Sequence, residues 1–391
     1  MLREQGETGV QTHVRAVRDW LVGRNRPVVL VTPFGQPRWL VYPLFGLRRV
    51  IDRLSRSASV WWYRHWHAVL LQRALQLRLA DGRPCVIYAQ CPLSARAALR
   101  ARVSDVQTVA MVVHFNLSQA DEWVDKGAIP REGRLFRGIR QQEATILPQV
   151  DALVCVSDFM RRELLQRIPA VGRVRSQVIP NFLADPGDPV FEAERNDLIT
   201  IGTLEYRKNQ RYAIEIVHAA AKLGRTLTLT LVGDGPDRAM LEALASELGV
   251  EKQVHFKGFV AHAAALMPAH RACLHVAHME NLPLTLIEAL SRGLPLFAPA
   301  VGGIPEVFRD GLEGRFIPLG DSAGAARLIV EWLDSGVIME KAGIASRKRY
   351  LDCFETDEIA GKLVEFLDGE PAGLHATQAL NNVKRELTHD H

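Results

Sequence analysis

The run that decides the fold of this chain is Glu280-Asn281-Leu282-Pro283-Leu284-Thr285-Leu286-Ile287-Glu288. Pro283 suits the first turn of a helix, and the residues from Leu284 to Ser291 favour helix. The free backbone N–H groups of that first turn form a ready anion site. Glu280 and Glu288 would repel a bare phosphate, so they are better placed to accept hydrogen bonds from hydroxyl groups beside it. A phosphate with polyols on both sides is a nucleotide sugar. The alternative is that both carboxylates lie on an ordinary solvated helix face.

Further motifs lie in order around this run. They are Val178-Ile179-Pro180-Asn181, Gly202-Thr203-Leu204-Glu205-Tyr206-Arg207-Lys208-Asn209, Gly233-Asp234-Gly235-Pro236-Asp237, Gly293-Leu294-Pro295-Leu296-Phe297-Ala298 and Val301-Gly302-Gly303-Ile304-Pro305-Glu306-Val307. Their order and spacing resemble the donor half of the retaining glycosyltransferases of family 4, of the bacterial polysaccharide and O-antigen type. The resemblance covers residues 143 to 320 well and the rest weakly. It implies an α/β protein of GT-B architecture, in which two Rossmann-like domains face each other across a cleft.

Composition limits the alternatives. A chain of 391 residues, 48% hydrophobic and 24% charged, is long enough for two globular domains. Its net charge of +4 is too small for a nucleic-acid binder of this length. Five scattered cysteines without a Cys-x-x-Cys pair indicate a reducing compartment and argue against structural zinc. No signal-peptide-like or membrane-spanning run is present, so we expect a cytoplasmic protein or one held peripherally on the inner face of a membrane.

Short apolar runs alternate with helical patterns in two series, which predicts two parallel sheets with crossover helices. We expect an N-terminal acceptor-binding domain at 1–183 and a C-terminal donor-binding domain at 184–353. The expected linker and hinge between them is Ala184-Asp185-Pro186-Gly187-Asp188-Pro189, at the start of the second domain. A helix within 354–371 crosses back in the family, and 372–391 resembles a frayed tail. The expected strands are 28–32, 85–89, 108–113, 153–156, 198–201, 227–232, 254–256, 272–276 and 296–298.

The loop after the expected strand 198–201 lies at the carboxyl edge of a sheet, where open α/β folds bind ligands. Arg207 and Lys208 would there direct cations toward a diphosphate leaving group. Thr203 stands where the family commonly has an arginine, and Arg207 is the candidate to replace it. The alternative is that both cations are solvated loop charges. Gly233-Asp234-Gly235 lacks the third glycine of a dinucleotide fingerprint, so it predicts a tight structural turn.

The resemblance also assigns roles. Glu280 touches the sugar hydroxyls, Glu288 holds the ribose, and Val260 contacts the base through its backbone, although Lys257 to Val260 could equally be a turn with Phe259 in the core. His114, at the end of an apolar strand, faces the transferred sugar and acceptor, unless it is a purely structural histidine. The expected catalytic residues are His114, Lys208 and Glu280. The expected donor-binding residues are Gly35, Gly202, Thr203, Arg207, Lys208, Val260, Asn281, Leu282, Leu284, Thr285 and Glu288. No metal or cofactor is expected.

The N-terminal half departs from the family pattern. The family's Gly-Gly loop is replaced by Pro33-Phe34-Gly35-Gln36-Pro37, with one glycine. Residues 45–80 carry seven arginines and one acid, Asp52, interleaved with Trp61, Trp62, Tyr63 and Trp66. Such a segment suits an anionic membrane interface or a polyprenyl-diphosphate acceptor. Aromatic core positions beneath a solvated basic face are the alternative.

The expected function is that of a retaining glycosyltransferase. It would move a hexose from a nucleotide-diphosphate sugar to a glycan or polyprenyl-linked acceptor, and the Gly-Thr-Leu-Glu opening slightly favours mannose. The competing interpretations are another GT-B enzyme, such as a sugar-nucleotide epimerase or a phosphorylase, and an idle glycosyltransferase-like binding subunit. Thr203 and the missing glycine pair favour the idle subunit. The joint presence of Lys208, Glu280 and Glu288 argues against it.

Overall fold

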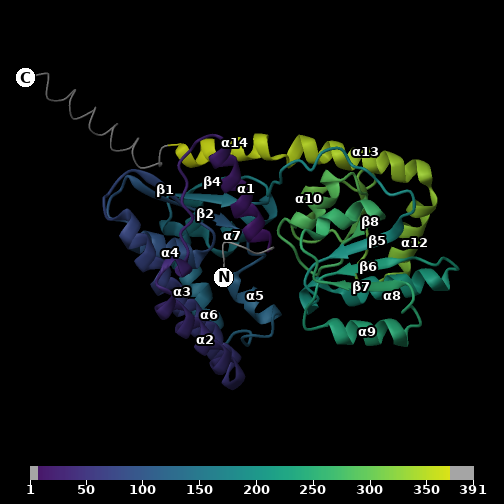
Figure 1. Cartoon of the computed structure of the whole chain (residues 1–391), viewed down its shortest axis with the longest axis horizontal. Coiled ribbons are helices and arrows are strands. Elements are labelled where there is room, and N and C mark those ends of the chain that lie inside the picture. The colour runs from purple at the N-terminus through teal and green to yellow at the C-terminus, as the bar shows by residue number, and fades with distance from the viewer. Residues whose placement is uncertain (1–7, 370–391) are drawn as a thin grey trace, which may run out of the picture.

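The computed structural model describes residues 8–369, which form two α/β halves side by side (Figure 1). The first half holds a four-stranded sheet in the order β1-β2-β3-β4, and the second holds a six-stranded sheet in the order β10-β9-β8-β5-β6-β7. All the pairings within both sheets are parallel. The strands are β1 Cys85–Ala89, β2 Gln107–Val113, β3 Ala152–Cys155, β4 Arg175–Val178, β5 Asn196–Ile201, β6 Leu229–Val232, β7 Val254–Gly258, β8 His270–Leu274, β9 Leu296–Ala298 and β10 Gly314–Phe316.

Helices pack on both sheets. In the first half they are α1 Gly9–Gly23, α2 Arg38–Leu54, α3 Arg56–Leu79, α4 Pro92–Ala101, α5 Gln119–Asp125, α6 Arg134–Ile146 and α7 Asp158–Arg167. In the second half and beyond they are α8 Gln210–Lys222, α9 Arg238–Glu247, α10 Leu284–Ser291, α11 Ile304–Val307, α12 Ser322–Asp334, α13 Gly336–Cys353 and α14 Thr356–Asp368. This is the two-sheet α/β arrangement that the alternation of patterns predicts.

Eight of the nine expected strands form, and α10 begins and ends where its sequence predicts. The expected strand at 28–32 is wrong, because that segment joins no sheet in the described chain. Pro27 and Pro33 bracket it, and proline has no N–H to donate to a ladder. The short strands β4 and β10 were not predicted, because Arg175–Val178 and Gly314–Phe316 mix polar and apolar residues.

The last helix returns to the first half of the chain. Figure 1 shows α13 and α14 running in succession along one side of both halves. Trp20 Nε1 on α1 donates to Asp357 Oδ1 at 3.1 Å, and Arg26 pairs with Asp368 at 2.7 Å. Arg175 of β4 donates to the carbonyl of Phe366 at 2.6 Å. Helix α14 therefore fastens the end of the second half to the first. The expected tail at 372–391 lies outside the described residues.

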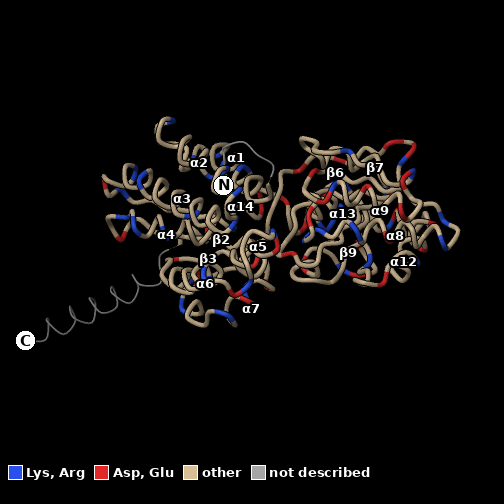
Figure 2. The backbone as a smooth tube through the Cα atoms, turned by 90° about the horizontal axis from the view of Figure 1, so that it is seen from below, with Lys and Arg blue, Asp and Glu red and all other residues tan. Residues whose placement is uncertain are grey.

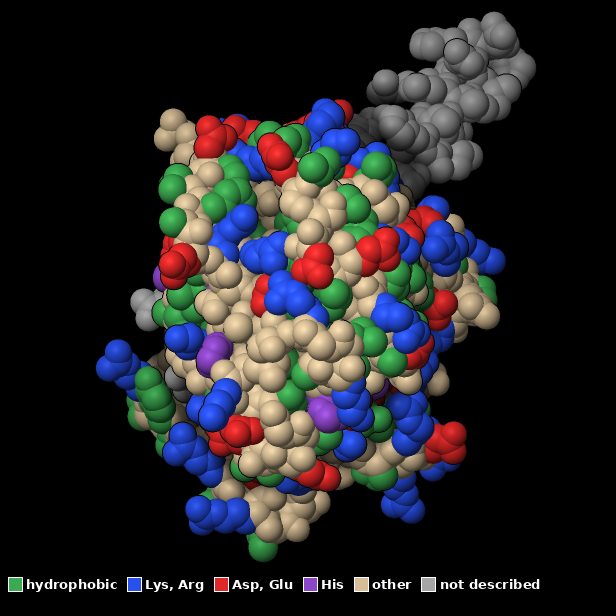
Figure 3. Space-filling model, turned by 90° about the vertical axis from the view of Figure 1, so that its right-hand side faces the viewer, with side chains coloured by type: hydrophobic (Ala, Val, Ile, Leu, Met, Phe, Trp, Pro, Cys, Tyr) green, Lys and Arg blue, Asp and Glu red, His purple; other side chains and the backbone are tan. Residues whose placement is uncertain are grey.

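Within residues 8–369, none of the helices combines the length and apolar character needed to cross a bilayer. The outward face of the second half carries acidic, basic and scattered apolar side chains side by side (Figure 3). That mixture is typical of a solvated protein surface.

Candidate functional site

Two pairs of glycines let the loops of the second half approach closely. A Cβ on Gly233 would lie 2.0 Å from the carbonyl oxygen of Gly202, and one on Gly235 would lie 2.2 Å from that of Leu204. Leu204 N donates to Asp234 O at 3.1 Å. The Gly233-Asp234-Gly235 turn thus packs on the loop that leads from β5 to Lys208. It is the structural turn that its sequence indicates.

The second pair, Gly302 and Gly303, packs against the backbone of Glu280 and Asn281. A Cβ on Gly302 would meet Glu280 O at 1.9 Å, and one on Gly303 would meet Asn281 O at 1.8 Å. Gly303 N also donates to Glu280 O at 3.0 Å. Only residues without a side chain allow this approach, so the backbone around Glu280 is held in one place.

The side chain of Glu280 is the centre of a buried charge cluster. Lys208 Nζ lies 2.5 Å from Glu280 Oε1, and Arg207 Nη1 lies 3.8 Å from Oε2. Arg207 also pairs with Glu205 at 3.0 Å, and His275 Nε2 lies 3.4 Å from Glu280 Oε1. Glu280 is 6% exposed. The structure therefore brings the expected residues Lys208, Arg207 and Glu280 together.

The cluster fixes the charge of its members. Burial alone would raise the pKa of Glu280, but Lys208, His275 and Arg207 outweigh it and hold that pKa well below its usual range. Burial lowers the pKa of His275, despite its contact with Glu280. At neutral pH, Glu280 is therefore ionised beside a neutral His275. An ionised carboxylate accepts hydrogen bonds and has no proton to give.

Asn281 joins the two halves of the protein. Its Nδ2 donates to the carbonyls of Val113 at 3.1 Å and Phe115 at 3.0 Å, and its Oδ1 accepts from Ser157 Oγ at 2.5 Å. Its backbone N donates to Asn116 Oδ1 at 3.0 Å. All these partners belong to the first half. The side chain that the sequence assigns to donor binding is therefore fully occupied by protein groups in this structure.

A second contact across the same junction supports Asn281. Glu306 accepts hydrogen bonds from Asp158 N at 2.7 Å and Phe159 N at 2.6 Å, so a carboxylate of the second half caps helix α7 of the first. Ser157 also accepts from Met160 N at 3.1 Å, as its expected N-cap role requires. The junction thus satisfies polar groups that would otherwise be buried without partners.

His114 lies beside this junction, between Val113 and Phe115. Its Nε2 lies 3.2 Å from Gln90 Oε1, while Gln90 Nε2 donates to Tyr88 O at 3.2 Å. With its amide nitrogen so engaged, Gln90 presents its oxygen to His114, which favours the tautomer protonated on Nε2. Burial, together with His13, lowers the pKa of His114 well below its usual value. His114 is therefore neutral at neutral pH.

His13 of α1 was not anticipated from the sequence. Its ring meets that of His114 edge-on at 4.7 Å, and its Nε2 lies 3.1 Å from the Tyr88 hydroxyl. Only 2% of its surface is exposed, and burial lowers its pKa to about 4. His13 lies on a helix far from the motifs in the sequence, so no sequence pattern pointed to it as a site residue. His275 and Asn116 were also missed, although each closely follows a strand, where ligand-binding residues gather.

The remaining expected donor residues spread around the cluster. Leu284, Thr285 and Glu288 are half-buried on α10, whereas Leu282 is buried in the core between the two halves. Gly202 lies in the loop before Lys208, and Thr203 there is exposed. Val260 packs partly against the core, while Phe259 is 70% exposed, so the core position considered for it is wrong. Gly35 lies exposed in the turn before α2, where a Cβ would meet nothing within 4 Å.

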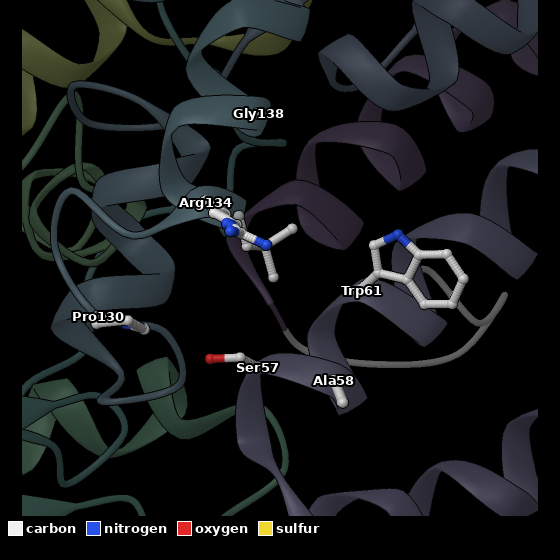
Figure 4. A pocket seen from close by; sticks show the side chains of 7 residues that line it. Ser57, Ala58, Trp61, Pro130, Arg134 and Gly138 are labelled. Atoms are coloured by element: carbon white, nitrogen blue, oxygen red, sulfur yellow. The ribbon is translucent and has the colours of Figure 1, made fainter.

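Two other features complete the inventory of sites. Among the described residues, no group of three or more His, Cys, Asp or Glu side chains is arranged to hold a metal ion. A hollow of about 570 Å³ lies between the start of α3 and the start of α6, and Glu280 is not among its lining residues (Figure 4). Its lining is mainly apolar and includes Trp61, Pro130, Leu135 and Arg134.

Each half of the chain matches a known protein family. Residues 8–184 match the family described as Glycosyltransferase Family 4, and residues 184–349 match the family described as Glycosyl transferases group 1. The chain is 30% identical over 383 residues to 2-deoxystreptamine glucosyltransferase of Streptomyces kanamyceticus, covering 92% of this chain and 95% of that protein. It is 27% identical over 286 residues to a Mycobacterium tuberculosis glycogen synthase, covering 71% and 67% of the two.

Solved structures share the fold. Anabaena HepE in complex with UDP and glucose superposes with a TM-score of 0.67 at 17% identity, over 93% of this chain and 97% of that one. S. aureus TarM superposes with a TM-score of 0.62 at 15% identity over 76% of this chain. This chain spans 59% of the TarM chain, which is the longer protein.

We predict that Asn281 controls the stability of the junction. Asn281→Ala removes the donor to Val113 O and Phe115 O and the acceptor of the Ser157 hydroxyl. Each lost buried hydrogen bond costs about 1–3 kcal/mol, so the free energy of unfolding should fall by about 3 kcal/mol or more. Asn281→Asp keeps the size but loses both donors, and should be as harmful. Denaturant unfolding, with exposed Asn196→Ala as the control, measures this. Equal stability of the Asn281 and Asn196 variants would contradict the assigned role.

We also predict that His13 makes the protein acid-sensitive. Its pKa is about 4 when folded and about 6.5 when unfolded, so the unfolded state binds more protons between these values and stability falls as pH falls. Between pH 7 and pH 5 this loss amounts to about 2 kcal/mol. His13→Phe should remove that part of the slope. Denaturation curves at pH 7 and pH 5 measure this difference. If wild type and variant lose the same free energy of unfolding between the two pH values, His13 is not responsible.

Proposed function

The chain belongs to glycosyltransferase family 4, and we propose that it moves a hexose from a nucleotide-diphosphate sugar to a hydroxyl group of a glycan or lipid-linked acceptor, with retention of anomeric configuration. The observation that carries this proposal is the buried cluster in which Lys208 and Arg207 converge on Glu280 at the carboxyl edge of the second sheet. That edge is where parallel α/β folds bind ligands.

The cluster has the groups that breaking a glycosyl–phosphate bond requires. Negative charge grows on the diphosphate as the bond breaks, and cations already in place stabilise it. Lys208 and Arg207 are held at this edge by Glu280 and Glu205. When a diphosphate arrives, the cations would turn part of their interaction toward it. Glu280, ionised at neutral pH, would then accept hydrogen bonds from sugar hydroxyls.

Helix α10 would supply the remaining donor contacts. Pro283 precedes it, and no side chain caps its first turn. Its free N–H groups would therefore be available to phosphate oxygens. Glu288, one turn further, would hold the ribose hydroxyls. His114, neutral and oriented by Gln90, would contact the transferred sugar from the opposite half.

The cluster argues against one of the two alternatives, and reaction products distinguish the other. An idle binding subunit would explain Thr203 in place of the usual arginine, but it gives no reason to bury a carboxylate between two cations at a cost of several kcal/mol per ion. An epimerase or a phosphorylase of the same fold would also use the cluster, but its products differ from those of a transferase.

A lipid-linked acceptor would, in addition, require the enzyme to work at a membrane surface.

We predict separable effects of Lys208 on stability and on catalysis. Lys208→Ala should lower turnover about a hundredfold or more, because the departing diphosphate loses a cation. It should also reduce stability by about 2–4 kcal/mol, because Glu280 loses its nearest counter-ion. The double variant Lys208→Ala/Glu280→Gln should recover stability but not turnover, since the buried charge is gone.

Thermal unfolding and release of UDP or GDP from a panel of nucleotide sugars measure these effects, with exposed Lys252→Ala as the control. Wild-type turnover in Lys208→Ala would remove Lys208 from the mechanism. Failure of the double variant to recover stability would refute the assigned ion pair.

We further predict that the two glutamates divide the donor between them. Glu288→Gln should weaken the binding of free UDP or GDP about tenfold, the effect of about 1.4 kcal/mol for a charged hydrogen bond. Glu280→Gln should leave that affinity nearly intact while reducing transfer. Titration calorimetry decides the matter, and the opposite pattern would exchange the two roles.

A further inference from the structure

Helix α2 exposes an apolar stripe. Successive residues of the stripe are three, five, three and four positions apart, which keeps them within one broad face of the helix. Their exposed fractions are 76% for Trp39, 62% for Tyr42, 45% for Leu47, 53% for Val50 and 84% for Leu54. Of the whole helix, only Val41 is fully buried. A helix that merely covers a core turns its apolar face inward, so this stripe is unusual for a soluble domain.

Arginines follow one edge of the stripe. Arg38, Arg49 and Arg53 are exposed, and within residues 8–369 none of them makes an ion pair or hydrogen bond. Figure 2 shows the Lys and Arg positions along α2 and α3 with few acids among them. Helix α2 contains one acid, Asp52. The stripe and its edge therefore combine exposed apolar surface with unneutralised positive charge.

The rest of the basic segment is used differently. Arg48 donates to Ser59 Oγ at 3.2 Å and lies over the ring of Tyr63, and Trp62 Nε1 donates to Leu44 O at 2.7 Å. These side chains fasten α3 to the inner face of α2. The aromatic residues of α3 are thus partly core, as the alternative interpretation of the sequence holds. The outer face of α2 takes no part in this packing.

Just beyond the end of α2, Ala58 and Trp61 on the first turns of α3 line the hollow shown in Figure 4. Trp61 is 53% exposed. The recess is lined from a point three residues after Leu54 along the chain, and it also holds Arg134. A recess of this kind suits acyl chains or a polyprenyl chain beside an anionic head group.

We propose that the outer face of α2 lies in the surface of an anionic lipid bilayer, with Trp39, Leu47, Val50 and Leu54 entering the acyl boundary and Arg38, Arg49 and Arg53 contacting the head groups. An apolar face bordered by arginines is the pattern of a helix that lies in the interface plane. The inference deepens the proposed function, because it identifies the surface that brings the enzyme to a lipid-linked acceptor.

A second copy of the chain is the competing occupant. Two α2 helices meeting through this face would bring their rows of arginines together with Asp52 as the one acid that each helix offers, which disfavours association. A bilayer rich in anionic lipid instead offers complementary charge along the whole edge. The charge pattern therefore selects a lipid surface.

The test is co-sedimentation of the full chain with phosphatidylglycerol-rich vesicles and with phosphatidylcholine vesicles, at low and high salt. The edge variant is Arg38→Gln/Arg49→Gln/Arg53→Gln, and the stripe variant is Trp39→Ser/Val50→Ser/Leu54→Ser. The matched control, Arg73→Gln/Leu77→Ser/Arg78→Gln, removes exposed arginines and an exposed leucine from α3.

Wild type and control should bind the anionic vesicles, and salt should weaken that binding. The edge variant should bind roughly a hundredfold more weakly at low salt, since each basic residue contributes about a factor of five near such a surface. The stripe variant should lose binding at both salt concentrations. Circular dichroism confirms folding, and slow donor hydrolysis without vesicles should be alike in all four proteins.

Absence of wild-type binding to anionic vesicles, or equal binding by the stripe variant and the control, would overturn the proposal. So would light scattering that shows a wild-type dimer and a monomeric stripe variant. If none of the four proteins hydrolyses any nucleotide sugar but the vesicle binding is as expected, the proposed function is wrong and the proposed membrane-binding face of α2 is still supported.

Discussion

The buried carboxylate of Glu280 is the constraint on which the site depends. A charge that is 6% exposed persists only if counter-ions and hydrogen bonds compensate it, and Lys208 at 2.5 Å supplies the main compensation. The pairing in turn requires the loops that carry both residues to hold their positions. The glycines at 233, 235, 302 and 303 make this possible, because backbone packs there where a side chain would collide. Backbone geometry and electrostatics thus specify the same arrangement.

Asn281 extends this order from one half of the protein to the other. Because its amide bonds to the carbonyls on either side of His114, the placement of Glu280 and that of His114 are linked through a few hydrogen bonds. Any separation of the two halves at this point must break them, together with the cap that Glu306 provides to α7. The cost of leaving those groups unsatisfied favours the closed arrangement. In a glycosyltransferase, closure of this kind would also keep water from the reacting sugar.

The sequence predicts the donor half better than the acceptor half for physical reasons. Strands such as β5 and β9 are buried on both faces and therefore read as apolar runs, and α10 has clear start and stop signals. The cations and the carboxylate of the cluster follow strand ends, where topology gathers them. The segment at 28–32 is equally apolar but joins neither sheet in the described chain, because composition alone does not determine whether a segment pairs with a neighbouring strand. His13 and the shared amide of Asn281 depend on contacts between residues 75 or more positions apart, which no local pattern encodes.

The measurement that most directly tests this account is release of nucleoside diphosphate from individual nucleotide sugars by wild type and by Glu280→Gln. Glutamine keeps the shape of the site and its contact with Lys208 but removes the charge that the account places against the sugar. We expect wild type to release UDP or GDP from one class of nucleotide sugar. The variant should bind the same free nucleotide equally well but should cleave the nucleotide sugar about a hundredfold more slowly. Equal rates of nucleotide release by the two proteins would contradict the role given to Glu280. So would a wild type that binds UDP or GDP but releases neither from any nucleotide sugar.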